Sequence, residues 1–268
     1  MKKLMTILLT ILIAYGAILV FFYAIQSSLI FYPQAVPAAV SGNKQVEEVH
    51  IKTTAGEMLH GWISKGGSAP PHKLIIYFGG NAEEVSHMIP RAQTLDDWAL
   101  LLVNYPGYGR SQGKPGQDSF FRAALAIYDH ALSRDDIDPD HIVLMGRSIG
   151  TGSAAFLAHE RPVRAVIMIS PFESLQPVAQ ASMPFLPVGL LLQHKFPSKN
   201  YAPQIEAPLL AFYGTEDHII PPRHSKNLAA LWKGPKRLIA LEGFDHNDIF
   251  ESREMWDSIS RFLQEQTN

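Results

Sequence analysis

The apolar and polar positions divide the chain into one long apolar segment and a series of short apolar runs. Residues 4–25 carry no charged side chain, and Lys2 and Lys3 precede them. At about 1.5 Å per residue, this segment spans about 33 Å as a helix, which is enough to cross the apolar core of a bilayer. The pattern predicts a transmembrane anchor over residues 1–26.

A cleaved signal peptide is the main alternative for this segment. The apolar part of a signal peptide is about 7–15 residues long and is followed by a small-x-small cleavage site. Here the apolar run is longer, and residues 24–27 (AIQS) fit such a site poorly. Because the next basic residue after Lys3 is Lys44, the positive-inside rule predicts a cytoplasmic N-terminus. The remainder then lies outside the cytoplasm, in the periplasm if the source is bacterial.

The rest of the chain predicts a linker, a hairpin and then alternating strands and helices. Prolines and a Ser-Gly-Asn turn signal predict a linker over 27–45, and alternating segments near 46–52 and 59–64 predict an antiparallel hairpin. Continuous apolar runs, typical of buried parallel strands, follow at 73–78, 98–104, 141–145, 164–169, 208–213 and 236–241. Helical spacing follows at 119–133, 150–161, 223–233 and 249–264, and a further helix is expected from Ala82. This alternation predicts an α/β domain over 46–268, with a mostly parallel sheet covered by helices on both faces.

One segment does not fit the alternation. Between the strands at 164–169 and 208–213 lie almost 40 residues rich in apolar side chains and interrupted by prolines. An insertion of this size is normally functional or disordered, and its apolar content argues against disorder. We expect residues 171–202 to form a small helical cap over the site, with Phe172, Leu175, Met183 and Phe185 binding substrate.

Composition narrows the class of protein. The 268 residues include 47% hydrophobic and 18% charged residues, which is a globular balance, and the net charge of -2 lacks the basic excess of a nucleic-acid binder. The chain has no cysteine, so disulfides and metal-thiolate sites are excluded. It also contains no P-loop, no dinucleotide-binding glycine fingerprint and no His-Glu-x-x-His pair. We therefore expect no cofactor and no metal.

Residues 146–150 (GRSIG) match the G-x-S-x-G pattern and stand where an apolar strand meets a helix. Such a sharp turn lifts a serine hydroxyl above the sheet edge, and glycines are needed because side chains there would collide with neighbouring backbone. The position predicts Ser148 as a nucleophile. Its hydroxyl needs a base to become reactive.

Asp217 and His246 follow the strands at 208–213 and 236–241. The carboxyl ends of parallel strands meet at one edge of a sheet, so both should lie near Ser148. We expect His246 to act as the base and Asp217 to orient it. Glu173, after the strand at 164–169, is the main rival of Asp217 for the role of the acid.

An oxyanion hole requires two backbone N–H groups near the nucleophile. One is expected from Ile149, directly after the serine, and the other from Asn81, in the glycine-containing loop that follows the strand at 73–78. The glycines in this loop let the backbone approach a substrate closely.

The chain over about residues 28–264 resembles the membrane-anchored alpha/beta-hydrolases related to the fungal bud-emergence proteins and the animal protein-depalmitoylating hydrolases. The resemblance rests on LIFYPQ (29–34), YFGGNAEE (77–84), NYPGYGRSQGKP (104–115), LMGRSIGTG (144–152), SPFESL (170–175), FYGTEDHIIP (212–221) and LEGFDHND (241–248). It implies the alpha/beta-hydrolase fold and the same triad and oxyanion residues. One departure is that the family commonly has His-Gly before the oxyanion residue, whereas this chain has Gly79-Gly80.

We therefore expect a serine hydrolase that cleaves carboxylic ester or thioester bonds of a small or lipid-like acyl substrate through an acyl-enzyme on Ser148. Two alternatives stay open. One is a serine aminopeptidase-like amide hydrolase, because such enzymes share the fold. The other is a non-catalytic, membrane-tethered binding protein.

Overall fold

The computed structural model of the protein describes residues 1–36, 46–65, 69–95 and 97–267. Within them an eight-stranded sheet has the order β1-β2-β4-β3-β5-β6-β7-β8. β2 pairs antiparallel with both β1 and β4, and the other neighbouring strands pair in parallel. The strands are β1 (Val46–Lys52), β2 (Met58–Ser64), β3 (His72–Phe78), β4 (Trp98–Val103), β5 (Ile137–Arg147), β6 (Ala165–Ile169), β7 (Leu209–Gly214) and β8 (Lys236–Leu241). The predicted hairpin and parallel sheet are confirmed.

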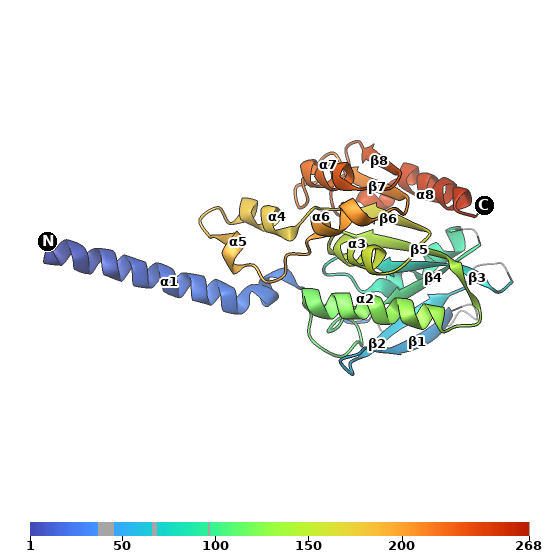
Figure 1. Ribbon diagram of the computed structural model, residues 1–268, viewed down its shortest axis with the longest axis horizontal. Helices are drawn as coiled ribbons and strands as arrows, with labels where there is room; N and C mark the ends of the chain where they lie inside the picture. Colours follow the sequence, from blue (N-terminus) through green and yellow to red (C-terminus); the bar gives the residue numbers. More distant parts are fainter. Residues whose placement is uncertain (37–45, 66–68, 96, 268) are drawn as a thin grey trace.

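Helices cover both faces of this sheet (Figure 1). The α-helices are α1 (Lys2–Ile30), α2 (Gln117–Leu132), α3 (Ile149–Glu160), α4 (Leu175–Ser182), α5 (Val188–Leu191), α6 (Ser198–Tyr201), α7 (Pro222–Leu231) and α8 (Arg253–Glu265). The 3₁₀ helices are η1 (Val85–Thr94), η2 (Ala202–Gln204) and η3 (Ile249–Glu251). Side chains of α2, α3 and α7 pack in one apolar cluster, and those of η1 and α8 pack in a second cluster on the other face.

The central strands are apolar on both sides because both faces are covered. In β3, Leu74, Ile76 and Phe78 belong to the first cluster, whereas Ile75 and Tyr77 belong to the second. All five side chains are at most 1% exposed. Successive strand residues point to opposite faces, so this continuous apolar run fills two cores at once.

Two helices differ from the sequence-based expectation. The helix expected from Ala82 begins only at Val85 and is 3₁₀, because Ala82 has a positive φ of 55° and Pro90 removes a backbone donor inside the element. The helix expected over 249–264 is interrupted at Ser252. The Ser252 hydroxyl accepts a hydrogen bond from the N–H of Met255 at 3.2 Å, and this cap starts α8 as a separate helix.

The apolar N-terminal segment forms one long helix that projects from the body beside α4 and α5 (Figure 1). α1 ends at Ile30, so it continues for four residues into the segment predicted as a linker. Of the remaining predicted linker residues 31–45, those at 37–45 lie outside the described residues. The insertion at 171–202 is helical, since it contains α4, α5 and α6.

The last turns of α1 pack against the insertion. Leu19, Phe22 and Ile30 contact a small apolar cluster formed by Leu186, Val188 and Leu192. Gln26 is 8% exposed, and its side-chain amide both donates to and accepts from the backbone at the end of α5. It donates to the carbonyl of Leu191 at 3.1 Å and accepts from the N–H of Gln193 at 2.8 Å. A buried amide that uses both its donor and its acceptor fixes the helix in register with the insertion.

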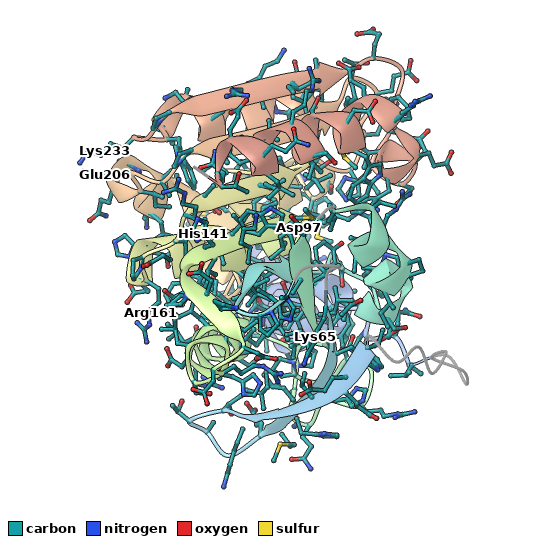
Figure 2. The ribbon with its side chains drawn as sticks, turned by 90° about the vertical axis from the view of Figure 1, so that its right-hand side faces the viewer. Lys65, Asp97, His141, Arg161, Glu206 and Lys233 are labelled. Atoms are coloured by element: carbon teal, nitrogen blue, oxygen red, sulfur yellow. The ribbon has the colours of Figure 1, made fainter. Side chains whose placement is uncertain are left out.

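The end of the molecule that faces away from α1 is rich in charged side chains (Figure 2). Ion pairs at this end join Lys65 to Asp136 at 3.0 Å and Lys233 to Glu206 at 2.6 Å. By contrast, the insertion beside α1 exposes large apolar side chains, among them Phe185 and Leu190. The two ends of the molecule therefore differ sharply in polarity.

Candidate active site

Ser148 lies between the last residue of β5 and the first residue of α3, with a φ of 50°. A non-glycine residue in this left-handed region is strained by about 1–3 kcal/mol and persists only where its surroundings hold it. Here the Ser148 N–H donates to the carbonyl of Ile169 at 2.8 Å, and its own carbonyl accepts from the N–H and the hydroxyl of Thr151 at 2.9 and 2.6 Å. The turn therefore has the geometry expected of a nucleophile elbow.

The two glycines of the G-x-S-x-G pattern are required by close backbone approach. A Cβ at Gly146 would lie 2.7 Å from the carbonyl oxygen of Gly150, and a Cβ at Gly150 would lie 2.1 Å from the carbonyl oxygen of Phe78. Both contacts are with backbone, which cannot move aside as a flexible side chain does. A side chain at either position would thus collide with neighbouring backbone, as expected from the sequence.

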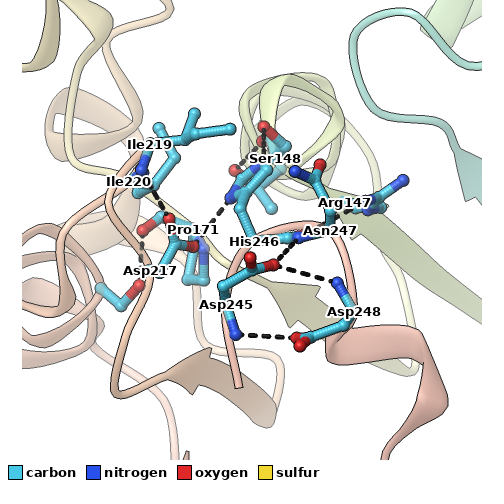
Figure 3. A network of polar contacts seen from close by, with 12 residues as sticks. Arg147, Ser148, Pro171, Asp217, Ile219, Ile220, Asp245, His246, Asn247 and Asp248 are labelled. Atoms are coloured by element: carbon cyan, nitrogen blue, oxygen red, sulfur yellow. Dashed lines mark hydrogen bonds and ion pairs between the residues drawn. The ribbon is translucent and has the colours of Figure 1, made fainter. Parts of the chain in front are cut away.

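Two further loops bring an imidazole and a carboxylate to Ser148 (Figure 3). His246 Nε2 lies 3.0 Å from Ser148 Oγ, and His246 Nδ1 lies 2.7 Å from Asp217 Oδ2. Asp217 follows β7 and His246 follows β8, so the three predicted residues meet at the carboxyl edge of the sheet. All three are less than 9% exposed.

The surroundings of Asp217 define the protonation pattern of this chain of hydrogen bonds. Asp217 Oδ1 accepts from the N–H groups of Ile219 and Ile220 at 3.0 and 2.7 Å. These bonds hold the carboxylate in place beside the imidazole. In the tautomer with its proton on Nδ1, His246 donates to Asp217 Oδ2, and its Nε2 faces the Ser148 hydroxyl as an acceptor.

The loop that carries His246 is shaped by its own aspartates. Asp245 accepts from the N–H groups of Asn247 and Asp248 at 2.6 and 3.1 Å, and Asp248 accepts from the N–H of Asp245 at 2.7 Å (Figure 3). These backbone hydrogen bonds hold the pKa of Asp245 below its ordinary value. Both aspartates therefore act as turn residues.

Glu173 does not contact His246. Its carboxylate pairs with His224 Nδ1 at 2.9 Å and also accepts from the Asn227 amide at 3.3 Å. His224 is buried on α7, so this pair fastens the base of the insertion to α7. Of the two rival carboxylates, the structure brings Asp217 and not Glu173 to the imidazole.

Asn81 and Ile149 line the same cavity as Ser148. In the part of the chain that the structure describes, the backbone N–H of neither residue donates to another protein group. The N–H of neighbouring Gly80, by contrast, donates to Glu83 Oε2 at 2.6 Å. The two N–H groups expected for an oxyanion hole are therefore free to bind a ligand.

A buried network around Glu83 braces this loop, and the sequence analysis did not predict it. Glu83 accepts hydrogen bonds from the Tyr77 hydroxyl and the Gly80 N–H, and it pairs with Arg147 Nη1 at 3.2 Å. Burial, and next the negative charge of Glu83, raise the pKa of Tyr77 well above its ordinary value, so this phenol stays a donor. Arg147 also donates to the carbonyl of His246 at 3.2 Å. The two charged residues of this pair were visible in the sequence, because Glu83 lies within YFGGNAEE and Arg147 directly precedes Ser148.

The Asn81 side chain connects the same loop to α1. Its amide nitrogen donates to the carbonyl of Ile30, the last residue of the helix. Its amide oxygen accepts from the Tyr108 hydroxyl at 2.8 Å and from the Tyr32 N–H at 3.0 Å. Asn81 therefore caps the end of α1 and also lines the cavity.

The cavity above Ser148 has a volume of about 590 Å³. Three of the residues predicted to bind substrate, Phe172, Leu175 and Met183, line it. Phe185 does not, and its side chain is 63% exposed because its loop between α4 and α5 faces outward. The structure therefore places Phe185 outside this cavity. Residues of α1 also line the cavity, which the sequence analysis did not predict: Phe22, Gln26, Leu29 and Ile30.

Within the described ranges, Glu48, His50 and His60 place three possible metal-ligand atoms within 4.8 Å of one another on the β1–β2 hairpin. The Glu48 carboxylate already pairs with Arg110 at 3.2 Å and with His60. None of the three lines the cavity above Ser148. The hairpin group is therefore separate from the candidate active site.

Comparisons with known proteins identify the family and the fold. Residues 73–199 match a family model described as the alpha/beta hydrolase fold. An uncharacterized protein of Mycobacterium tuberculosis is 34% identical over 273 residues, covering 98% of this chain and 96% of that protein. The human protein ABHD12B is 28% identical over 223 residues, covering 72% of this chain and 61% of that protein.

Solved structures have the same fold. An esterase of Pyrococcus furiosus superposes with a TM-score of 0.70 at 18% identity, covering 89% of this chain and 98% of the other. The structure of Est1E from Butyrivibrio proteoclasticus with bound ferulic acid superposes with a TM-score of 0.69 at 22% identity, covering 82% and 99%. At these identities the likeness concerns the fold alone.

Proposed function

Because this chain belongs to the alpha/beta-hydrolase family, we propose that it is a serine hydrolase that cleaves carboxylic ester or thioester bonds through an acyl-enzyme on Ser148. The observation that carries this proposal is the continuous chain of hydrogen bonds from Asp217 through His246 to Ser148. A serine hydroxyl needs such a base before it can attack a carbonyl carbon.

In the proposed reaction, Ser148 Oγ attacks the carbonyl carbon while His246 Nε2 takes up the hydroxyl proton. The resulting oxyanion accepts hydrogen bonds from the N–H groups of Asn81 and Ile149, and Asp217 stabilises the imidazolium. His246 then protonates the leaving alcohol or thiol as the tetrahedral intermediate collapses to the acyl-enzyme. His246 then deprotonates a water molecule, which attacks the carbonyl carbon of the acyl-enzyme. The acid is released, and His246 returns the proton to Ser148 Oγ.

The lining of the cavity favours an acyl ester over a peptide with a free amino group. Among the described residues that line it, most are apolar and none is an aspartate or a glutamate. An aminopeptidase would need a carboxylate to hold the ammonium group of its substrate, because a buried, unpaired charge is strongly unfavourable. This observation places amide hydrolysis second. The non-catalytic alternative has no specific observation in its favour.

The test is covalent labelling together with turnover. A fluorophosphonate probe should label the wild-type protein, and p-nitrophenyl butyrate should be hydrolysed. Ser148→Ala should abolish the labelling and reduce turnover by about 10³-fold or more. Ser133→Ala is the matched control, since the exposed Ser133 hydroxyl donates to the carbonyl of His130 and lies outside the cavity lining. Labelling of Ser148→Ala at the wild-type level would refute the proposal, and faster turnover of aminoacyl amides than of esters would favour the peptidase.

We further propose that α1 anchors the hydrolase domain in a membrane, with the N-terminus in the cytoplasm and the domain on the opposite side. Among the described helices, α1 alone is long and apolar enough to cross a bilayer. Signal sequences share these two properties, so the support comes also from its contacts with the folded domain. Lys2 and Lys3 before the apolar run favour the stated orientation.

A further inference from the structure

We propose that the last turns of α1 form a wall of the acyl-binding cavity, so that the anchor helix itself selects for long-chain acyl esters. This inference rests on the proposed function, because it assigns the substrate of the same site. Its ligand is an amphiphile whose ester lies at Ser148 and whose hydrocarbon chain lies against α1. The helix is then part of the active site as well as a tether.

The first support is the spacing of the lining residues on the helix. Phe22, Gln26, Leu29 and Ile30 stand at positions i, i+4, i+7 and i+8, which share one face of an α-helix. Three of the four side chains on this face are apolar. The same cavity is lined by Leu175 and Met183 from the insertion. One face of α1 and the insertion thus border the same largely apolar space.

The second support is the polarity within the cavity. Its polar lining includes Asn81, Ser148, His246 and Asn247, which come from the loops at the carboxyl edge of the sheet. Apolar side chains from α1, α4 and α5 form much of the rest. The volume of about 590 Å³ is within the range of about 300–1,000 Å³ for small-molecule sites. Such a division suits a ligand with one polar reacting group and one hydrocarbon chain.

The third support is that the wall is fixed at three points. Gln26 hydrogen-bonds the chain at Leu191 and Gln193, and Ser27 Oγ lies 2.9 Å from His194 Nε2. The Asn81 amide donates to the carbonyl of Ile30. These contacts join α1 both to the insertion and to the loop with the expected oxyanion N–H. The wall therefore has a defined position relative to Ser148.

The fourth support is the surface around the wall. Phe185 and Leu190, at 63% and 87% exposed, lie in the insertion segment that packs against α1. Most α1 residues between Lys3 and Phe22 are apolar and largely exposed. The Tyr15 hydroxyl donates to the carbonyl of Phe185 at 3.1 Å, so this loop lies alongside the helix. An apolar cap beside an apolar helix suits a bilayer surface, from which a hydrocarbon chain passes directly to the cavity.

The experiment compares kcat/KM for p-nitrophenyl esters from acetyl to dodecanoyl, using the full-length protein in detergent micelles. For the wild type, kcat/KM should rise by about threefold to fourfold for each added methylene until the cavity is filled. Leu29→Trp places a larger side chain on the wall and should lower the dodecanoyl-to-acetyl ratio of kcat/KM by at least tenfold. Phe22→Ala enlarges the cavity and should move the optimum to longer chains. Leu12→Trp is the matched control, because Leu12 is exposed on α1 and does not line the cavity.

The outcomes separate the inference from the function on which it rests. Fluorophosphonate labelling of Ser148 and acetyl-ester turnover test the proposed function for every variant. If labelling persists but the chain-length profiles of Leu29→Trp and Phe22→Ala equal that of Leu12→Trp, the wall is refuted and the serine hydrolase stands. If the wild-type protein is not labelled and turns over no ester, the proposed function fails, and the inference fails with it. Thermal unfolding of each variant shows whether it folds. If either Leu29→Trp or Phe22→Ala does not fold, the chain-length profile of the other variant tests the wall.

Discussion

Arg147 Nη1 lies 3.2 Å from Glu83 Oε2, and this ion pair joins the loop after β3 to the residue directly before Ser148. Both side chains are largely buried, and Arg147 also donates to the carbonyl of His246. The pair therefore connects three loops of the proposed site: those that carry Asn81, Ser148 and His246. Glu83 provides a bracing contact for the loop at Gly79-Gly80, through the N–H of Gly80.

The first prediction concerns this brace. Glu83→Gln should lower kcat by about 10- to 100-fold with little change in KM, because a small displacement of the oxyanion loop misplaces its N–H donor. Arg147→Met should have a similar effect, since both variants break the same pair. Steady-state kinetics on a short-chain ester measures both. Glu254→Gln, on the exposed first turn of α8, is the control. A 10- to 100-fold rise in KM with unchanged kcat would contradict a positioning role.

The second prediction separates the two rival carboxylates. Asp217→Asn should lower kcat by about 10³- to 10⁴-fold, because the amide cannot hold His246 in the tautomer that accepts the serine proton. Glu173→Gln should lower kcat by less than tenfold, because Glu173 pairs with His224 at the base of the insertion. The measurement is kcat for one activated ester at one pH. Equal losses in the two variants would show that the acid has been assigned incorrectly.

The third prediction concerns pH. Burial lowers the pKa of His194, and the charge of Asp118 opposes this shift to a smaller extent. A lowered folded-state pKa means that the unfolded chain takes up the proton first. The stability from neutral His194 is therefore complete above about pH 6.5 and is lost as the pH falls below that value. Protonation would also displace the Gln117 N–H, which donates to His194 Nδ1 at 3.3 Å.

His194→Gln removes this titration and should flatten the decline of the melting temperature between pH 7 and pH 5 relative to the wild type. Thermal unfolding in one buffer series measures the difference. Parallel curves for the two proteins would contradict the assignment, whatever their absolute melting temperatures.

The fourth prediction concerns retention of the N-terminus. Residues 22–30 contact the insertion and line the cavity, so the mature protein should keep α1 intact. An alkaline carbonate wash should leave the protein in the membrane pellet, and its intact mass should include residues 1–26. Release of a form that begins after about residue 25 would show that the segment is a signal peptide.

The sequence predicted the sheet and the elbow because these depend on local patterns. Continuous apolar runs such as 73–78 occur where a strand is covered on both faces, and Gly146 and Gly150 are needed wherever backbone segments approach this closely. The meeting of Asp217 and His246 with Ser148 followed from topology, since parallel strands place their carboxyl ends at one edge. These features could be read from one chain without coordinates.

The contacts that the sequence did not predict join residues far apart in the chain. Glu83 and Arg147 are separated by 64 residues, and Gln26 and Gln193 by 167. No periodicity encodes such pairs, because each depends on how separate elements pack in three dimensions. The exposed position of Phe185 is a case of the same kind, since apolar character alone does not tell which side of a short helical insertion faces the cavity.

The end of α1 has a practical consequence for expression of this protein. A soluble version that begins after Ile30 would lack one side of the cavity and would leave the Asn81 amide without its carbonyl acceptor. Substrate profiles or inhibitor screens made with such a fragment would therefore describe an enzyme with a different pocket. The proposed anchor therefore calls for biochemical work on the full-length chain in detergent, nanodiscs or native membranes.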